Sequence, residues 1–100
     1  MSNTFNNPII IDTFTSDIDV GDSMFGLSCA TFFIESIEWQ TPESTTHGAI
    51  VRDGNGYILF DEKCTVAHQS VFKPFGGTPI IGLKIVADEV DSGKISIKIR

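Results

Sequence analysis

The sequence predicts an all-β protein, and three observations support this prediction. Apolar and polar residues alternate along several short segments, which is the two-residue period of a β-strand. Gly, Pro, Asn and Asp gather between these segments, as they do in turns. No stretch places apolar residues at helical spacing over three turns. We therefore expect a single-domain β-sandwich, or a jelly-roll-like barrel, of about seven to eight short antiparallel strands.

The first predicted strands lie near the amino terminus. Pro8 precedes a strand of three isoleucines at residues 9–11, and residues 18–20 are a second, weaker candidate. Residues 1–7 contain no Lys or Arg and no apolar run, so we do not expect a signal peptide. They predict an extended polar arm in front of one domain that comprises residues 8–100.

Residues 32–40 predict a longer strand because they are rich in aromatic and β-branched side chains. Phe33, Ile37 and Trp39 follow the two-residue rhythm of one apolar face, and Glu35 interrupts it. This interruption predicts either a β-bulge or a glutamate that faces a partner.

A hairpin is predicted in the middle of the chain. Residues 49–52 and 57–60 flank Asp-Gly-Asn-Gly at 53–56, where Gly and Asn tolerate the positive φ angles of a tight turn. Residues 66–72 predict a further strand, which should end at Lys-Pro-Phe-Gly-Gly in residues 73–77.

The carboxyl-terminal segment carries the clearest strand pattern. Three isoleucines at residues 95, 97 and 99 alternate with a serine and with the cations Lys94, Lys98 and Arg100. One face of this strand should therefore enter the core while the other faces water. Residues 81–85 alternate in the same way, and the turn-forming residues 88–93 predict a tight reversal between the two strands.

The net charge of −6 argues against binding to a phosphate backbone, so we expect no nucleic-acid partner. The first 51 residues contain seven acids and no Lys or Arg, which favours either simple solubility or contact between unlike faces of two copies. The apolar runs are too short to span a membrane, so we expect a chain made in the cytoplasm. Cys29 and Cys64 should then be buried thiols rather than a disulfide.

We predict no enzymatic, metal or cofactor site. His47 lies in a polar loop and His68 in a predicted strand, without a motif that would pair either with a nucleophile. Cys64 and His68 would be too far apart on a strand to bind one zinc ion. Residues 17–22 and 53–56 carry oxygen ligands that calcium prefers, but turn chemistry explains both segments.

Several segments together resemble small proteins encoded by tailed bacteriophages and prophages. The resemblance spans most of the chain and is carried by strand and turn motifs: Asn-Pro-Ile-Ile-Ile-Asp at 7–12, Ser-Ile-Glu-Trp at 36–39, the hairpin at 53–61, and the segments 82–84 and 91–95. It implies a virion component that is β-rich and present in many copies, often as a trimer. A capsid decoration (cement) protein is the first expectation, and a tail or fibre-associated module is the alternative.

This resemblance implies that the chain binds the major capsid protein or another virion protein as a homo-oligomer, in the assembled virion and without a cofactor. The arm would add hydrogen bonds to the edge of a neighbouring sheet, and the cations of the last strand would meet carboxylates. The predicted interaction residues are Met1, Ser2, Asn3, Thr4, Phe5, Asn6, Asn7, Lys94, Lys98 and Arg100.

A soluble module that binds carbohydrate or protein is the competing function. Exposed aromatic side chains that line a groove would favour it, and the candidates are Trp39, Tyr57, Phe72 and Phe75. We expect most of the eight phenylalanines in the core, with only Phe72 and Phe75 exposed.

Overall fold

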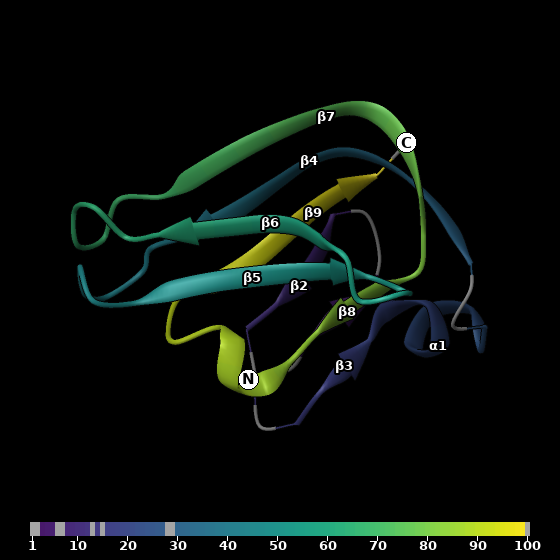
Figure 1. The fold of residues 1–100 in the computed structure, drawn as a ribbon, viewed down its shortest axis with the longest axis horizontal. Coiled ribbons are helices and arrows are strands. Elements are labelled where there is room, and N and C mark those ends of the chain that lie inside the picture. Colours follow the sequence, from purple (N-terminus) through teal and green to yellow (C-terminus); the bar gives the residue numbers. More distant parts are fainter. Residues whose placement is uncertain (1–2, 6–7, 13, 15, 28–29, 100) are drawn as a thin grey trace.

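The computed structural model describes residues 3–5, 8–12, 14, 16–27 and 30–99. Within them the chain forms a sandwich of two antiparallel β-sheets, which confirms the predicted fold class. Sheet A has the strand order β1-β2-β9-β4-β7, and sheet B has the order β3-β8-β5-β6 (Figure 1). The elements in chain order are β1 (Thr4–Phe5), β2 (Ile9–Ile11), β3 (Ile18–Asp19), α1 (Val20–Phe25), β4 (Thr31–Gln40), β5 (Gly48–Asp53), β6 (Ile58–Lys63), β7 (Val71–Ile81), β8 (Leu83–Ile85), the 3-10 helix η1 (Ala87–Glu89) and β9 (Lys94–Ile99).

The strand predicted at the end of the chain is β9, which lies in the middle of sheet A between β2 and β4. Ile95 and Ile97 are fully buried, and Ile99 is partly buried against the same core. On the opposite face Lys98 is exposed and Lys94 is half-buried. The prediction for this strand is therefore confirmed, because the isoleucines of β9 pack in the core between the two sheets.

A β-bulge in β4 decides which of its side chains enter the core. The pairing of β4 with both neighbours shifts between Ile34 and Ser36, so Glu35 lies at a bulge, which is one of the two alternatives that its position in the sequence left open. An inserted residue moves the following side chains to the other face, so the buried positions are even-numbered before the bulge and odd-numbered after it. The buried side chains of β4 are Phe32, Ile34, Ile37 and Trp39. The expectation that Phe33 faces the core is wrong, since this side chain is 50% exposed.

The segment before β7 differs from the prediction. Residues 64–70 form turns and irregular structure, so the strand predicted at residues 66–72 is wrong except at its last two residues. The turn predicted at residues 73–77 instead lies inside β7.

Strand β7 accommodates turn-forming residues because it is the edge of sheet A. Proline has no N–H to donate, so Pro74 and Pro79 are tolerated in a strand that has a neighbour on one side only. Gly76 and Gly77 have φ angles of 62° and 81°, and they lie opposite the bulge of β4. The residues of the predicted turn thus lie in an edge strand, opposite a bulge.

Gly82 moves the chain from one sheet to the other. Its φ angle is 76°, and it separates β7 in sheet A from β8 in sheet B. Residues 81–85, predicted as one strand, are therefore divided between the sheets, with Leu83 and Ile85 buried on the sheet B side. The reversal predicted at residues 88–93 is not a hairpin turn, because it begins in η1 and returns the chain to sheet A.

The hairpin predicted in the middle of the chain is confirmed as β5 and β6. The carboxylate of Asp53 accepts hydrogen bonds from the backbone N–H groups of Asn55 and Tyr57 (2.9 and 3.0 Å). The N–H of Gly54 donates to the carbonyl of Ile81 (2.9 Å), and a side chain at Gly54 would collide with that oxygen. Hydrogen bonds within the turn therefore stabilise it, and a further hydrogen bond attaches it to the end of β7.

The six-residue helix α1 is not among the predicted elements, because it is too short to show a helical period. Its N-cap is Asp19, which accepts a hydrogen bond from the N–H of Asp22 (3.1 Å), and Gly26 ends it in the left-handed conformation. The acidic run at residues 17–22 thus contains a helix cap. In the described parts of the chain, no helix has the length and apolar character needed to cross a membrane.

The described part of the predicted arm belongs to the sandwich. Residues 3–5 fold back so that β1 pairs with β2 and forms the second edge of sheet A. The Phe5 side chain packs against the core, and the side-chain oxygen of Asn3 accepts a hydrogen bond from the N–H of Asp12 (3.0 Å). The other arm residues lie outside the described residues: Met1, Ser2, Asn6 and Asn7.

Candidate functional site

The predicted interaction residues that the structure describes lie in one half of sheet A. Lys94 and Lys98 are on the outer face of β9, and residues 3–5 are on the same sheet with only β2 between them and β9. Arg100 lies outside the described residues. We call the outer face of β9, with Lys94, Ser96 and Lys98, the lysine face.

The lysine face has an acidic neighbour on β4. Glu38 is paired with Ser96 and so lies on the adjacent strand at a level between the two lysines. Its carboxylate accepts a hydrogen bond from the side-chain amide of Gln40 (2.8 Å). The outer faces of β9 and β4 thus bring two cations and one anion onto neighbouring strands.

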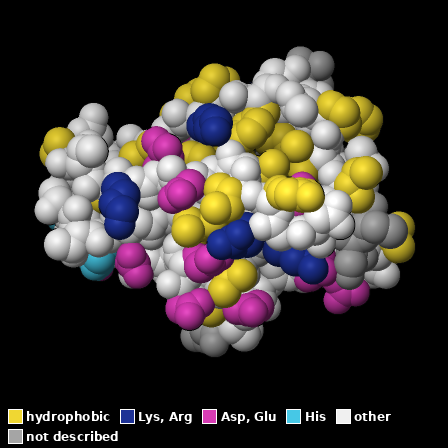
Figure 2. Space-filling model, in the orientation of Figure 1, with side chains coloured by type: hydrophobic (Ala, Val, Ile, Leu, Met, Phe, Trp, Pro, Cys, Tyr) yellow, Lys and Arg dark blue, Asp and Glu magenta, His cyan; other side chains and the backbone are white. Residues whose placement is uncertain are grey.

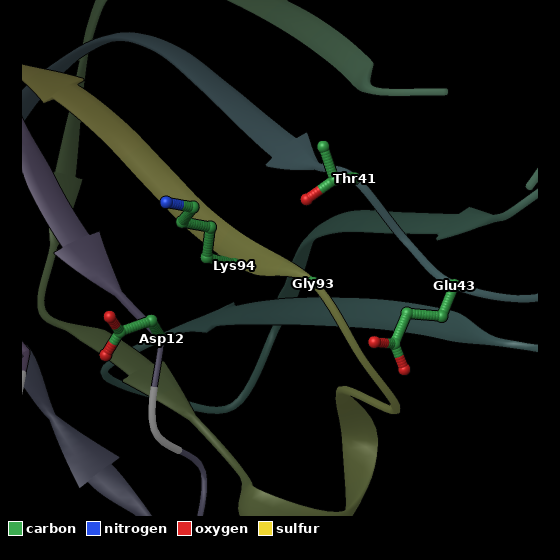
Figure 3. A pocket seen from close by; sticks show the side chains of 5 residues that line it. All are labelled: Asp12, Thr41, Glu43, Gly93 and Lys94. Atoms are coloured by element: carbon green, nitrogen blue, oxygen red, sulfur yellow. The ribbon is translucent and has the colours of Figure 1, made fainter. Parts of the chain in front are cut away.

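A shallow depression of about 270 Å³ lies at one end of the lysine face. Figure 3 shows Asp12 and Lys94 on one side of it and Thr41 and Glu43 on the other, with Gly93 between them. The lining mixes two carboxylates with one ammonium group and pairs no nucleophile with a histidine. Its charged groups can form hydrogen bonds and ion pairs with polar groups of a bound molecule.

Ser92 connects three segments beside this depression. Its hydroxyl lies 2.6 Å from Nδ1 of His47 and accepts a hydrogen bond from the N–H of Glu43 (2.9 Å). Its carbonyl accepts a hydrogen bond from the indole N–H of Trp39 (2.7 Å). Sequence reasoning missed this contact because 45 residues separate Ser92 from His47.

The Ser92–His47 contact has the first part of a catalytic triad but not the rest. A triad needs an acid that orients the histidine through its second ring nitrogen. In the part of the chain that the structure describes, no carboxylate forms a hydrogen bond with the ring of His47. We therefore interpret the contact as a tie between loops.

Trp39 is not available for ligand binding, contrary to its place among the aromatic candidates, because it is fully buried. Tyr57 and Phe72 are exposed, and Phe75 is partly buried. Tyr57 precedes β6, whereas Phe72 is near the start of β7, which follows the far end of β6. Tyr57 and Phe72 therefore do not line one groove.

The remaining zinc and thiol candidates lie in the segment that connects β6 to β7. Cys64 is a buried free thiol, as predicted, and its Sγ lies 3.2 Å from the carbonyl of Val66. Cys29 lies outside the described residues. His68 is exposed, with a φ angle of 68°, and its N–H donates to the carbonyl of Pro42 (2.6 Å).

Several carboxylates have structural partners. Glu89 accepts two hydrogen bonds from the guanidinium of Arg52 (2.9 and 2.7 Å), and these hydrogen bonds lower the pKa of Glu89. Asp17 and Asp91 each accept a hydrogen bond from a backbone N–H elsewhere in the chain (3.0 and 2.9 Å). Among the described residues, no three His, Cys, Asp or Glu side chains lie close enough together to hold a metal ion.

A second surface lies where β6, an edge strand of sheet B, faces β7, an edge strand of sheet A. The ammonium group of Lys73 on β7 donates to the carbonyl of Leu59 on β6 (3.2 Å) and lies 5.4 Å from the centre of the Phe75 ring. Figure 2 shows hydrophobic side chains gathered over this part of the molecule. We call this surface, which is marked by Leu59, Lys73 and Phe75, the open side.

The open side was not predicted from the sequence. Leu59 and Phe75 are only partly buried against the core, and Tyr57 and Ile58, which precede Leu59 in the chain, are 72% and 50% exposed. The expectation that only Phe72 and Phe75 are exposed among the phenylalanines is also wrong, because Phe25 and Phe33 are exposed. An alternating pattern cannot reveal such a surface, because it does not say which strands are edges.

Comparison with protein-family models, with curated proteins and with solved structures gave no match. The likeness to phage proteins therefore depends on the sequence segments that suggested it.

Proposed function

We propose that the chain is a non-enzymatic structural protein of a tailed-phage virion. In this proposal it is a capsid decoration protein, and its partner is the major capsid protein or another virion protein. The observation that carries the proposal is that the lysine face and the edge strand β1 lie on one sheet, separated only by β2. The sequence resemblance supplies the kind of partner.

Attachment through the lysine face requires many copies. An exposed ion pair contributes about 0–1 kcal/mol, so Lys94 and Lys98 of one copy cannot hold the chain on a particle by themselves. Contacts repeated over linked copies raise the overall affinity without any new kind of contact. A homo-oligomer, with a trimer as the expected form, meets this requirement.

Strand β1 offers a second contact. It is an edge of sheet A, and among the described residues no strand pairs with its outer side. Backbone groups at such an edge can accept a strand from a partner. The proposed role of the arm is thereby changed: residues 3–5 complete their own sheet and present its edge, rather than reaching across to a neighbour.

Co-sedimentation of the protein with phage heads that lack their decoration protein tests the proposal. We expect the wild type to sediment with the heads and Lys98→Glu to bind at least about fivefold more weakly, because the reversed charge repels the carboxylates of the partner. Lys63→Glu is the matched control, since Lys63 is an exposed lysine on β6 of sheet B.

Two results would contradict the proposal. One is a wild-type protein that stays in the supernatant with every type of head tested. The other is equal binding by Lys98→Glu and Lys63→Glu, which would show that the lysine face makes no specific contact.

A further inference from the structure

We infer that the outer face of sheet A carries an apolar band through which the chain binds its virion partner, and that the matching surface of this partner has apolar side chains beside carboxylates. The inference rests on the proposed function and deepens it, because it names the chemistry of the partner at the same site. The band consists of five side chains on β4 and β7: Phe33, Phe72, Pro74, Pro79 and Ile81.

The strand register places the whole apolar band on one face of the sheet. Directly opposite residues of an antiparallel pair point to the same face. The β4 residues of the pairs below alternate with the buried residues of β4, so they and their partners face away from the core. These pairs, with the β4 residue first, are Thr31–Ile81, Phe33–Pro79, Ser36–Pro74 and Glu38–Phe72.

The side chains of the apolar band are exposed. Phe33, Phe72 and Ile81 are 50%, 59% and 56% exposed, and both prolines are exposed as well. Single apolar side chains are common on protein surfaces, whereas a group of them on one face is typical of a contact surface. The apolar band is such a group, since its members share one face of one strand pair.

The apolar band is continuous with the lysine face. Sheet A has β4 between β9 and β7, so residues of the three strands form rows across its outer face. Two rows lead from the lysine face to the apolar band: Lys98–Ser36–Pro74 and Ser96–Glu38–Phe72. A partner with carboxylates opposite the lysines therefore brings the adjoining part of its surface over the band.

The apolar band supplies a contribution that the lysine face lacks. Exposed ion pairs contribute little to binding, whereas burial of apolar surface is the main favourable term in most protein association. Protein interfaces accordingly have an apolar centre and a polar rim. On sheet A the apolar band corresponds to the centre, and Lys94 and Lys98 correspond to a part of the rim.

The charges beside the apolar band favour a different protein over a second copy. A two-fold contact between two such faces brings two lysines and only one glutamate from each copy into one interface, which leaves positive charge without a counter-charge. A partner with carboxylates opposite Lys94 and Lys98 leaves no such excess. We therefore assign the band to the virion partner, and the copies of the homo-oligomer bind each other through other surfaces.

Co-sedimentation with phage heads that lack their decoration protein tests the inference when the dissociation constant is measured at low salt and at about 1 M salt. Ile81→Thr and Phe72→Thr should each raise it roughly tenfold at both salt concentrations, because each removes apolar contact. The weaker binding of Lys98→Glu should instead approach that of the wild type at high salt, where charges are screened beyond about 3 Å. Threonine keeps the preference for a strand, and thermal melts check the fold of each variant.

Ile58→Thr is the matched control for Ile81→Thr. Ile58 is 50% exposed and lies in a strand, but it pairs with Arg52 in sheet B. This variant should bind the heads like the wild type.

Three results would overturn the inference. If the wild type and Ile58→Thr sediment and Ile81→Thr and Phe72→Thr bind equally well, the band makes no contact, while the proposed function still holds. If the wild type does not sediment with any head, both the inference and the proposed function are wrong. If ultracentrifugation of the free protein shows self-association that Ile81→Thr and Phe72→Thr abolish, a second copy covers the band instead of a virion partner.

Discussion

Arg52 joins three segments of the chain through its guanidinium group. It donates two hydrogen bonds to Glu89 of η1 and one to the carbonyl of Gly56 in the turn after β5 (2.9 Å). The hydrogen bonds to Arg52 stabilise the ionised form of Glu89 and so lower its pKa below the ordinary value. This ion pair should therefore make the stability of the fold depend on pH.

We predict that Glu89→Gln removes a stabilisation that is present at neutral pH and absent in acid. The folded pKa of Glu89 is below the unfolded value of about 4.3, so the stabilisation is complete above that value and is lost as the pH falls through the folded pKa. Urea unfolding midpoints measured from neutral pH into acid should show the wild type and Glu89→Gln converging. Glu62→Gln, at an exposed glutamate of β6, is the control and should follow the wild type throughout. A constant difference between wild type and Glu89→Gln at all pH values would show that the carboxylate charge is not the cause.

At the scale of elements, the short turn before β9 connects distant parts of the chain through hydrogen bonds. Ser92 binds the indole of Trp39, the ring of His47 and the backbone of Glu43, so it ties β9 to β4 and to the segment that follows it. Gly93 comes next, with a φ angle of 73°. A side-chain carbon at Gly93 would collide with the carbonyl oxygen of Gln40 and approach the indole nitrogen of Trp39.

We predict that Gly93→Ala is much more destabilising than Gly56→Ala. Both glycines have left-handed φ angles, 73° and 89°, so both variants incur the backbone penalty of about 1–2 kcal/mol. Only Gly93 has atoms in the way, whereas the space around Gly56 is open. We expect a loss of about 2–5 kcal/mol in the free energy of unfolding for Gly93→Ala, measured by chemical denaturation. Equal losses for the two variants would mean that the contact with Gln40 relaxes without cost.

For the whole molecule, stability depends on the interior that the two sheets share. β2 and β9 pair in register, with Ile97 opposite Ile9 on the core face and Ser96 opposite Ile10 on the outer face. Ile97 and Ile9 are fully buried, whereas Ile10 is only partly buried. Ile97 of β9 and Ile10 of β2 therefore lie on neighbouring strands but on opposite faces of sheet A.

We predict that Ile97→Ala costs about 2–5 kcal/mol in the free energy of unfolding, because it leaves a cavity between the sheets. A domain of this size has a total stability of about 5–15 kcal/mol, so the loss should be visible as a large fall in the denaturation midpoint. Ile10→Ala is the matched control and should cost about 1 kcal/mol or less. If both variants lost the same stability, the assignment of the two faces of β9 and β2 would be wrong.

The features that the sequence predicted correctly depend on neighbouring residues. The alternation at residues 95–99 was sufficient to predict β9 and its buried face, and Asp-Gly-Asn-Gly was sufficient to predict the β5–β6 turn. The interruption at Glu35 allowed a bulge or a glutamate that faces a partner, and the shift in strand pairing selects the bulge. For the predicted interaction residues, the sequence placed Lys94 and Lys98 on the polar face of one strand.

The features that were missed depend on contacts between distant parts of the chain. Pro74 and Gly76 are turn residues by local chemistry, and only the edge position of β7 and the bulge opposite it allow them in a strand. Gly82 sends one alternating segment into two different sheets. The contact of Ser92 with His47 likewise exists only after the sheets have packed.

The sequence by itself determined which side chains are apolar, where the β5–β6 turn lies and which face of β9 is buried, because the two-residue period is a local property of extended backbone. The tertiary structure alone decided which strand lies at an edge, which sheet each strand joins and which apolar side chains remain uncovered. Strand order is set by pairing between segments far apart in the chain, and no short-range pattern contains that information. The open side is a result of that order, since it exists only because β6 and β7 are both the last strands of their sheets.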